Sequence, residues 1–88
     1  MPNVLFLDDA LAEFSYWAHN DRKIFDKINT LINDIDRNGA AKGIGKPEHL
    51  KHRDGWSRRI NDEHRLIYKV TEENIIAVKS CKGHYDDK

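Results

Sequence analysis

The sequence has one cysteine, two prolines and no long apolar run. A single thiol, Cys81, cannot close an internal disulfide or build a cysteine-rich metal site, and it is expected to be a small core residue. No stretch approaches the roughly 18 consecutive apolar residues of a membrane span, and the first residues lack the basic and apolar regions of a signal peptide. These absences predict a cytoplasmic protein with no membrane partner.

An excess of positive charge is also missing, because 15 basic residues balance 15 acidic ones. This balance argues against strong autonomous binding to free nucleic acid. The charges are nevertheless unevenly distributed. Residues 1–41 carry four bases and seven acids, a balance of −3, whereas residues 42–69 carry eight bases and four acids, a balance of +4. Such an asymmetry suggests an anionic ligand against the second half of the chain, and a solvated surface of mixed charge is the alternative that the sequence leaves open.

The length of 88 residues and an apolar content of 39% support one domain, residues 1–88, with one modest core. The chain is too short for a cofactor domain beside a substrate domain. Any active site must lie on the surface of a single layer.

The first half predicts one strand and two helices. A short apolar strand over 3–7 precedes a helix from Asp9 to Asn20, whose apolar face is Leu11, Phe14, Trp17 and Ala18. A second helix begins after Asp21 and ends at Asn38-Gly39. Its apolar stripe consists of Ile24, Phe25, Ile28, Leu31, Ile32 and Ile35.

The second half predicts four strands. A connection over 42–47 leads to a short strand over 48–52, and a tight turn over 53–55 follows. Strands over 56–61 and 64–70 form a hairpin, and the last strand spans 74–82. The expected fold is α+β, with the two N-terminal helices packed on one face of a twisted antiparallel sheet. The other face of the sheet is left for ligand or solvent.

Two arginines are expected to share that open face. If Ile60 and Leu66 point into the core, strand alternation turns Arg59 and Arg65 the opposite way. Neighbouring cations repel each other, so an anionic ligand would explain the pair. Two solvated arginines with glutamate partners are the alternative that the sequence leaves open.

The sequence contains the groups needed to cut RNA without a metal. A base must take the proton of the ribose 2′-hydroxyl, an acid must protonate the leaving 5′-oxygen, and cations must hold the phosphate. Glu48, His84, Arg59 and Arg65 are of the required types, and Tyr85 could stack on a nucleobase. The five histidines lack the spacing of zinc ligands, and Gly43-Ile44-Gly45-Lys46 lacks Walker-motif spacing.

Several motifs, in order, resemble the YoeB/Txe family of RelE-superfamily toxins over about residues 3–85. They are Lys27-Ile28-Asn29, Gly43-Ile44-Gly45-Lys46-Pro47-Glu48, Trp56-Ser57-Arg58-Arg59-Ile60, Glu63-His64-Arg65-Leu66 and His84-Tyr85. The resemblance implies a RelE-like, microbial-ribonuclease-like fold. It also implies a type II toxin that is a metal-independent mRNA endoribonuclease (mRNA interferase), acting without a cofactor in the A site of the 70S ribosome and inhibiting translation.

The resemblance implies site residues and partners as well. Glu48 would be the general base, His84 the general acid, Arg65 the phosphate and transition-state clamp and Tyr85 a positioning residue, with Lys51 and Arg59 as auxiliary substrate contacts. A partly disordered YefM-like antitoxin would neutralise the toxin, operator DNA would be bound only through that antitoxin, and a homodimer is also implied.

The sequence departs from the family in three places. The loop over 52–55 is shorter than usual, the acidic tail 86–88 follows the final His-Tyr, and Asn38-Gly39-Ala40-Ala41 replaces a Pro-Phe turn. Acidic groups beside the site would disfavour RNA, which predicts a weaker or salt-sensitive enzyme. Two alternatives stay open: a catalytically weak or inactive antitoxin-binding module acting in operon repression, and a ribonuclease acting on free RNA.

Overall fold

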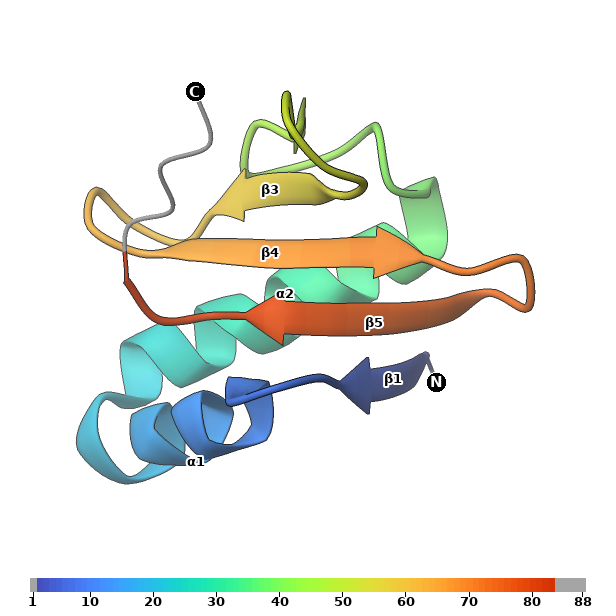
Figure 1. Ribbon diagram of the computed structural model, residues 1–88. Helices are drawn as coiled ribbons and strands as arrows, with labels where there is room; N and C mark the ends of the chain where they lie inside the picture. Colours follow the sequence, from blue (N-terminus) through green and yellow to red (C-terminus); the bar gives the residue numbers. More distant parts are fainter. Residues whose placement is uncertain (1, 84–88) are drawn as a thin grey trace.

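The computed structural model describes residues 2–83, which form two helices and five strands (Figure 1). In chain order the elements are β1 (Asn3–Phe6), α1 (Ala10–Asn20), α2 (Arg22–Asn38), β2 (Glu48–His49), β3 (Trp56–Arg59), β4 (Arg65–Val70) and β5 (Ile75–Ser80). Both helices lie on one face of the sheet (Figure 1). The predicted α+β architecture is thereby confirmed. No helix within residues 2–83 is both long and apolar enough to span a membrane.

The five strands form one mixed sheet in the order β1-β5-β4-β3-β2. The pairs β2–β3, β3–β4 and β4–β5 are antiparallel, as expected. The edge pair β1–β5 is parallel, which corrects the expectation of a wholly antiparallel sheet. Side-chain alternation indicates which face a residue occupies but carries no information on strand direction, so the sequence could not reveal this pair.

The predicted strand over 48–52 is shorter in the structure, because β2 ends at His49. The amide of Leu50 donates to the carbonyl of Gly55 at 3.0 Å, so the chain turns back on itself. Leu50 is buried beneath the resulting loop.

Helix α2 agrees closely with its sequence pattern. The Asp21 side chain accepts hydrogen bonds from the amides of Lys23 and Ile24, at 3.1 and 3.3 Å, and so caps the helix. The residues of its stripe that are fully covered are Ile28, Leu31, Ile32 and Ile35. Burial of four branched side chains fixes this helix against the sheet.

Helix α1 faces the core with most of its expected apolar face. Trp17 is buried and Phe14 and Ala18 are half-buried, but Leu11 is 57% exposed. Phe14 lies between the rings of Phe6 and Phe25, with ring centroids 5.1 and 4.7 Å apart. Ala10, which the expected face left out, is buried, so the covered face is centred on positions 10, 14 and 17 and Leu11 lies at its exposed border.

The chain that follows β5 is attached to α1. The indole nitrogen of Trp17 donates to the carbonyl of Cys81 at 2.9 Å, and Glu13 accepts from the Cys81 amide at 2.8 Å. Burial and the nearby Glu13 carboxylate raise the pKa of the Cys81 thiol to about 12. Cys81 is therefore an inert core residue, as expected, and its backbone ties the end of the sheet to the first helix.

Candidate active site

Glu48, Arg59 and Arg65 share the sheet face that lies opposite the helices. Glu48 is the cross-strand partner of Ser57, and Arg59 is the partner of Arg65. Directly paired residues of antiparallel strands project to one face, and so do residues two apart in one strand. Glu48 and Arg59 are diagonal neighbours, which usually places their backbones about 7–8 Å apart. That spacing leaves room for a phosphate group between the carboxylate and the two guanidinium groups.

The two arginines of this face have no carboxylate partner among residues 2–83. The ion pairs in this part of the chain are Arg58–Asp34 and Lys69–Asp54, and neither Arg59 nor Arg65 takes part in one. Glutamate partners for the two arginines are thus not found in the described part of the chain. Two adjacent cations without a counterion favour an anionic ligand.

The structure brings together part of the predicted site. Lys51 is exposed in the loop between β2 and β3, away from the paired strands. His84 and Tyr85 lie outside the described residues. The structure does describe Gly83, the residue just before them. The Arg65 amide donates to the carbonyl of Gly83 at 3.2 Å. Position 84 therefore follows, by one peptide bond, a residue that is hydrogen-bonded to the proposed phosphate clamp.

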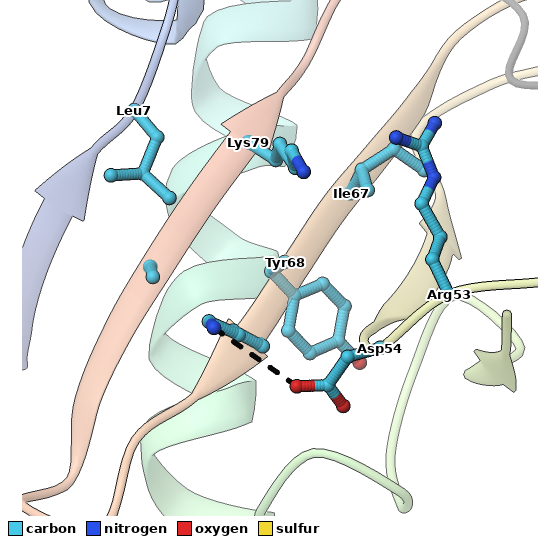
Figure 2. A pocket seen from close by; sticks show the side chains of 8 residues that line it. Leu7, Arg53, Asp54, Ile67, Tyr68 and Lys79 are labelled. Carbon is cyan, nitrogen blue, oxygen red and sulfur yellow. Dashed lines mark ion pairs between the residues drawn. The ribbon is translucent and has the colours of Figure 1, made fainter.

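A hollow of about 250 Å³ lies on the same face, between the loop after β2 and strands β4 and β5 (Figure 2). Its lining combines apolar groups and one tyrosine with three cations and one acid, namely Leu7, Ile67, Ala77, Tyr68, Arg53, Lys69, Lys79 and Asp54. Lys69 and Asp54 are 4.0 Å apart and largely exposed, so their attraction is weak. The hollow extends the positive side of the open face beyond the arginine pair.

Arg58 is a buried residue whose importance the sequence interpretation missed. It is 0% exposed and projects to the helix side of the sheet, where it pairs with Asp34 of α2. Its guanidinium group also donates to the carbonyls of Gly39, Lys42 and Ile44, at 2.7–2.9 Å. The sequence did indicate that Arg58 points into the core, because residues two apart in a strand face the same side and Ile60 is a core residue.

Arg58 and Tyr68 together hold the loop that leads to Glu48. The Tyr68 hydroxyl accepts from Nε of Arg58 at 2.8 Å and donates to the carbonyl of Ala40 at 2.7 Å. Burial raises the pKa of Tyr68, so this hydroxyl keeps its proton. The Arg59 amide then donates to the Gly45 carbonyl at 2.7 Å, which aligns the end of the loop beside β3.

The two glycines of this loop are required by close packing. A Cβ atom at Gly43 would lie 1.8 Å from a carboxylate oxygen of Asp34, and one at Gly45 would lie 2.8 Å from Leu31. Both glycines also have positive φ angles, 124° and 83°. The glycines thus allow the loop to approach Asp34 and Arg58, and the loop places Glu48 at the edge of the sheet.

Asp34 gives the fold a pH-dependent contribution. The hydrogen bond from Arg58 lowers the pKa of the Asp34 carboxyl below its ordinary value of 3.8. A depressed pKa in the folded state stabilises the protein above the unfolded-state pKa, and this contribution is lost as the pH falls through the folded-state pKa. We expect Asp34→Asn to lower the free energy of unfolding strongly at pH 7 and progressively less below pH 3.8. Urea denaturation of both proteins between pH 7 and pH 2.5 measures this, and a gap that stays constant would contradict it.

Within residues 2–83, no three histidine, cysteine, aspartate or glutamate side chains gather closely enough to hold a metal ion. His49 packs edge-on against Trp56, and His64 does so against Trp17. The packing partner of His49 lies in β3, and that of His64 lies in α1.

The sequence matches one characterised protein family over most of its length. Residues 6–85 match the family described as YoeB-like toxin of bacterial type II toxin-antitoxin system. Toxin YoeB of Escherichia coli (strain K12) is 40% identical over 84 residues, which cover 93% of this chain and 98% of that protein. Toxin YoeB of Streptomyces coelicolor is 43% identical, with the same coverage.

Solved structures give the same result. A chain of the heterotetrameric YoeB-YefM toxin-antitoxin complex from Staphylococcus aureus superimposes with a TM-score of 0.90 and 49% identity, covering 97% of this chain and 99% of that one. The Staphylococcus aureus YoeB dimer superimposes with a TM-score of 0.88 and 50% identity, covering 96% and 98%. Sequence and fold are thus both similar over nearly the whole of each chain.

Proposed function

Because the chain belongs to the family of YoeB-like toxins of bacterial type II toxin-antitoxin systems, we propose that it is an mRNA endoribonuclease acting in the ribosomal A site. The observation that carries the proposal is the shared open face of Glu48, Arg59 and Arg65. These residues supply a carboxylate for proton abstraction and two guanidinium groups for a phosphate. Cutting messenger RNA there inhibits translation.

Cleavage proceeds by attack within the RNA chain. Glu48 takes the proton of a ribose 2′-hydroxyl, and the 2′-oxygen forms a bond to the adjacent phosphorus. The bond from phosphorus to the 5′-oxygen breaks as His84 gives that oxygen a proton. The products are a 2′,3′-cyclic phosphate and a 5′-hydroxyl, and this route needs no metal ion.

The remaining groups stabilise and orient the reacting phosphate. Arg65 donates to the non-bridging oxygens, on which negative charge accumulates in the transition state, and Arg59 supports it from the adjacent strand. Tyr85 positions the substrate, and Lys51 is an auxiliary contact to the RNA. The formal net charge of zero means that this chain binds free RNA weakly, so the ribosome must present the substrate.

The partners follow from the same family. The relatives from Staphylococcus aureus form a complex with YefM and a dimer, so we propose a YefM-like antitoxin and a homodimer for this chain. The antitoxin neutralises the toxin by covering the basic face, and it provides the contact with operator DNA. Action on ribosomes places the protein in the cytoplasm.

Primer extension on a defined mRNA, with and without 70S ribosomes, tests the proposal. We expect cleavage sites that appear only when ribosomes are present. Cleavage of free RNA at the same sites would favour a stand-alone ribonuclease. Absence of cleavage under every condition, with tight binding of the antitoxin, would favour a binding module that acts only in operon repression.

A further inference from the structure

His64 belongs to the Glu63-His64-Arg65-Leu66 motif, yet the proposed reaction gives it no part. Its Nδ1 accepts a hydrogen bond from the amide of Gly83 at 2.8 Å. Such an acceptor requires a neutral ring that carries its proton on Nε2. His64 therefore restrains the backbone at the end of the described chain.

The His64 ring is itself held in place. It packs edge-on against Trp17, with ring centroids 4.7 Å apart and an interplanar angle of 69°. Trp17 is 6% exposed and donates to the carbonyl of Cys81, so its own position is fixed by the core. The acceptor atom of His64 is thus attached to a rigid part of the fold.

Gly83 is hydrogen-bonded through both its amide and its carbonyl, to His64 and to Arg65, the first residue of β4. His64 accepts from its amide, and the amide of Arg65 donates to its carbonyl at 3.2 Å. Strand β5 has already ended at Ser80, and Gly83 adopts a φ of 99° with no atom within 4 Å of where a Cβ would lie. A glycine in open space is restrained only by such hydrogen bonds.

We infer that His64 is a positioning residue, whose Nδ1 fixes the backbone of Gly83, the residue that precedes the proposed acid, His84. The inference rests on the proposed ribonuclease function. A general acid must come within hydrogen-bond reach of the leaving oxygen, and a misplacement of about 1 Å can cost a hundredfold in rate. The amide of Arg65 donates to the carbonyl of the same Gly83, so the proposed phosphate clamp and the backbone that leads to the acid are held together.

Two variants separate the hydrogen bond from the ring packing. His64→Phe keeps a ring against Trp17 but has no acceptor, whereas His64→Asn keeps an acceptor oxygen at the δ position and removes the ring. Single-turnover cleavage of mRNA on 70S ribosomes is measured at saturating toxin. We expect His64→Phe to lower the rate constant about tenfold or more with unchanged half-saturation, and His64→Asn to stay within about threefold of the wild type.

An NMR measurement on the free protein tests the hydrogen bond between His64 and Gly83 independently of any cleavage activity. In ¹H–¹⁵N NMR spectra, the Gly83 amide proton should move upfield in His64→Phe and keep its wild-type shift in His64→Asn. A wild type without cleavage would overturn the proposed function and leave this NMR result standing. Wild-type rates in His64→Phe would overturn the inference, as would a loss of rate in His64→Asn with the Gly83 shift retained.

Discussion

Glu48→Gln is expected to reduce mRNA cleavage on ribosomes by a factor of about 10²–10⁴, the usual contribution of a general base. The amide has the size of the carboxylate but cannot accept the proton of the 2′-hydroxyl. Within residues 2–83, the Glu48 side chain makes no ion pair, and it is exposed on a two-residue edge strand. The stability of the fold should therefore be unchanged.

The matched control is Glu73→Gln, which removes one negative charge from the exposed turn between β4 and β5, at the end of β4 remote from Arg65. We expect the rate of this control to stay within about twofold of the wild type, because exposed charges away from the site contribute little. Single-turnover rates and melting temperatures of the three proteins provide the comparison. Equal rates for wild type and Glu48→Gln would remove Glu48 from the mechanism.

Arg58→Met should lower the free energy of unfolding by about 3–5 kcal/mol, the usual cost of removing one partner from a buried ion pair. The substitution leaves the carboxylate of Asp34 without its cation. It also removes the donor from the carbonyls of Gly39, Lys42 and Ile44. Unsatisfied groups of this kind carry most of the cost.

Lys69→Met is the corresponding control for Arg58→Met, because Lys69 pairs with Asp54 on the surface, where the two side chains are 51% and 83% exposed. A change below about 1 kcal/mol is expected there. Urea denaturation gives both values. A loss of less than 1 kcal/mol in Arg58→Met would show that the loop over 39–46 is held mainly by other contacts.

The sequence predicts those parts of the fold that depend on periodic burial. Helix α2 has an unbroken apolar stripe and an Asp21 cap, and both are present as expected. The arginine pair of β3 and β4 follows from alternation in a hairpin, and the observed register places Arg59 opposite Arg65.

The features that sequence analysis missed depend on contacts between distant segments. Arg58 is buried because Asp34, 24 residues earlier, supplies its counterion. The parallel pairing of β1 with β5 depends on the path of the chain across the helices, which no local pattern encodes. Leu11 lies outside the core because the packing of α1 centres its covered face on Ala10, Phe14 and Trp17. His64 and Gly83 meet only because β4 lies beside the end of β5.

The central claim is that Glu48 begins an attack by the 2′-oxygen on the adjacent phosphorus. The most direct test is mass spectrometry of the fragments released from mRNA on 70S ribosomes. The account predicts a 2′,3′-cyclic phosphate on the upstream fragment and a 5′-hydroxyl on the downstream fragment, both lost in Glu48→Gln. A 3′-hydroxyl with a 5′-phosphate would contradict it, because attack by the 2′-oxygen cannot leave these ends.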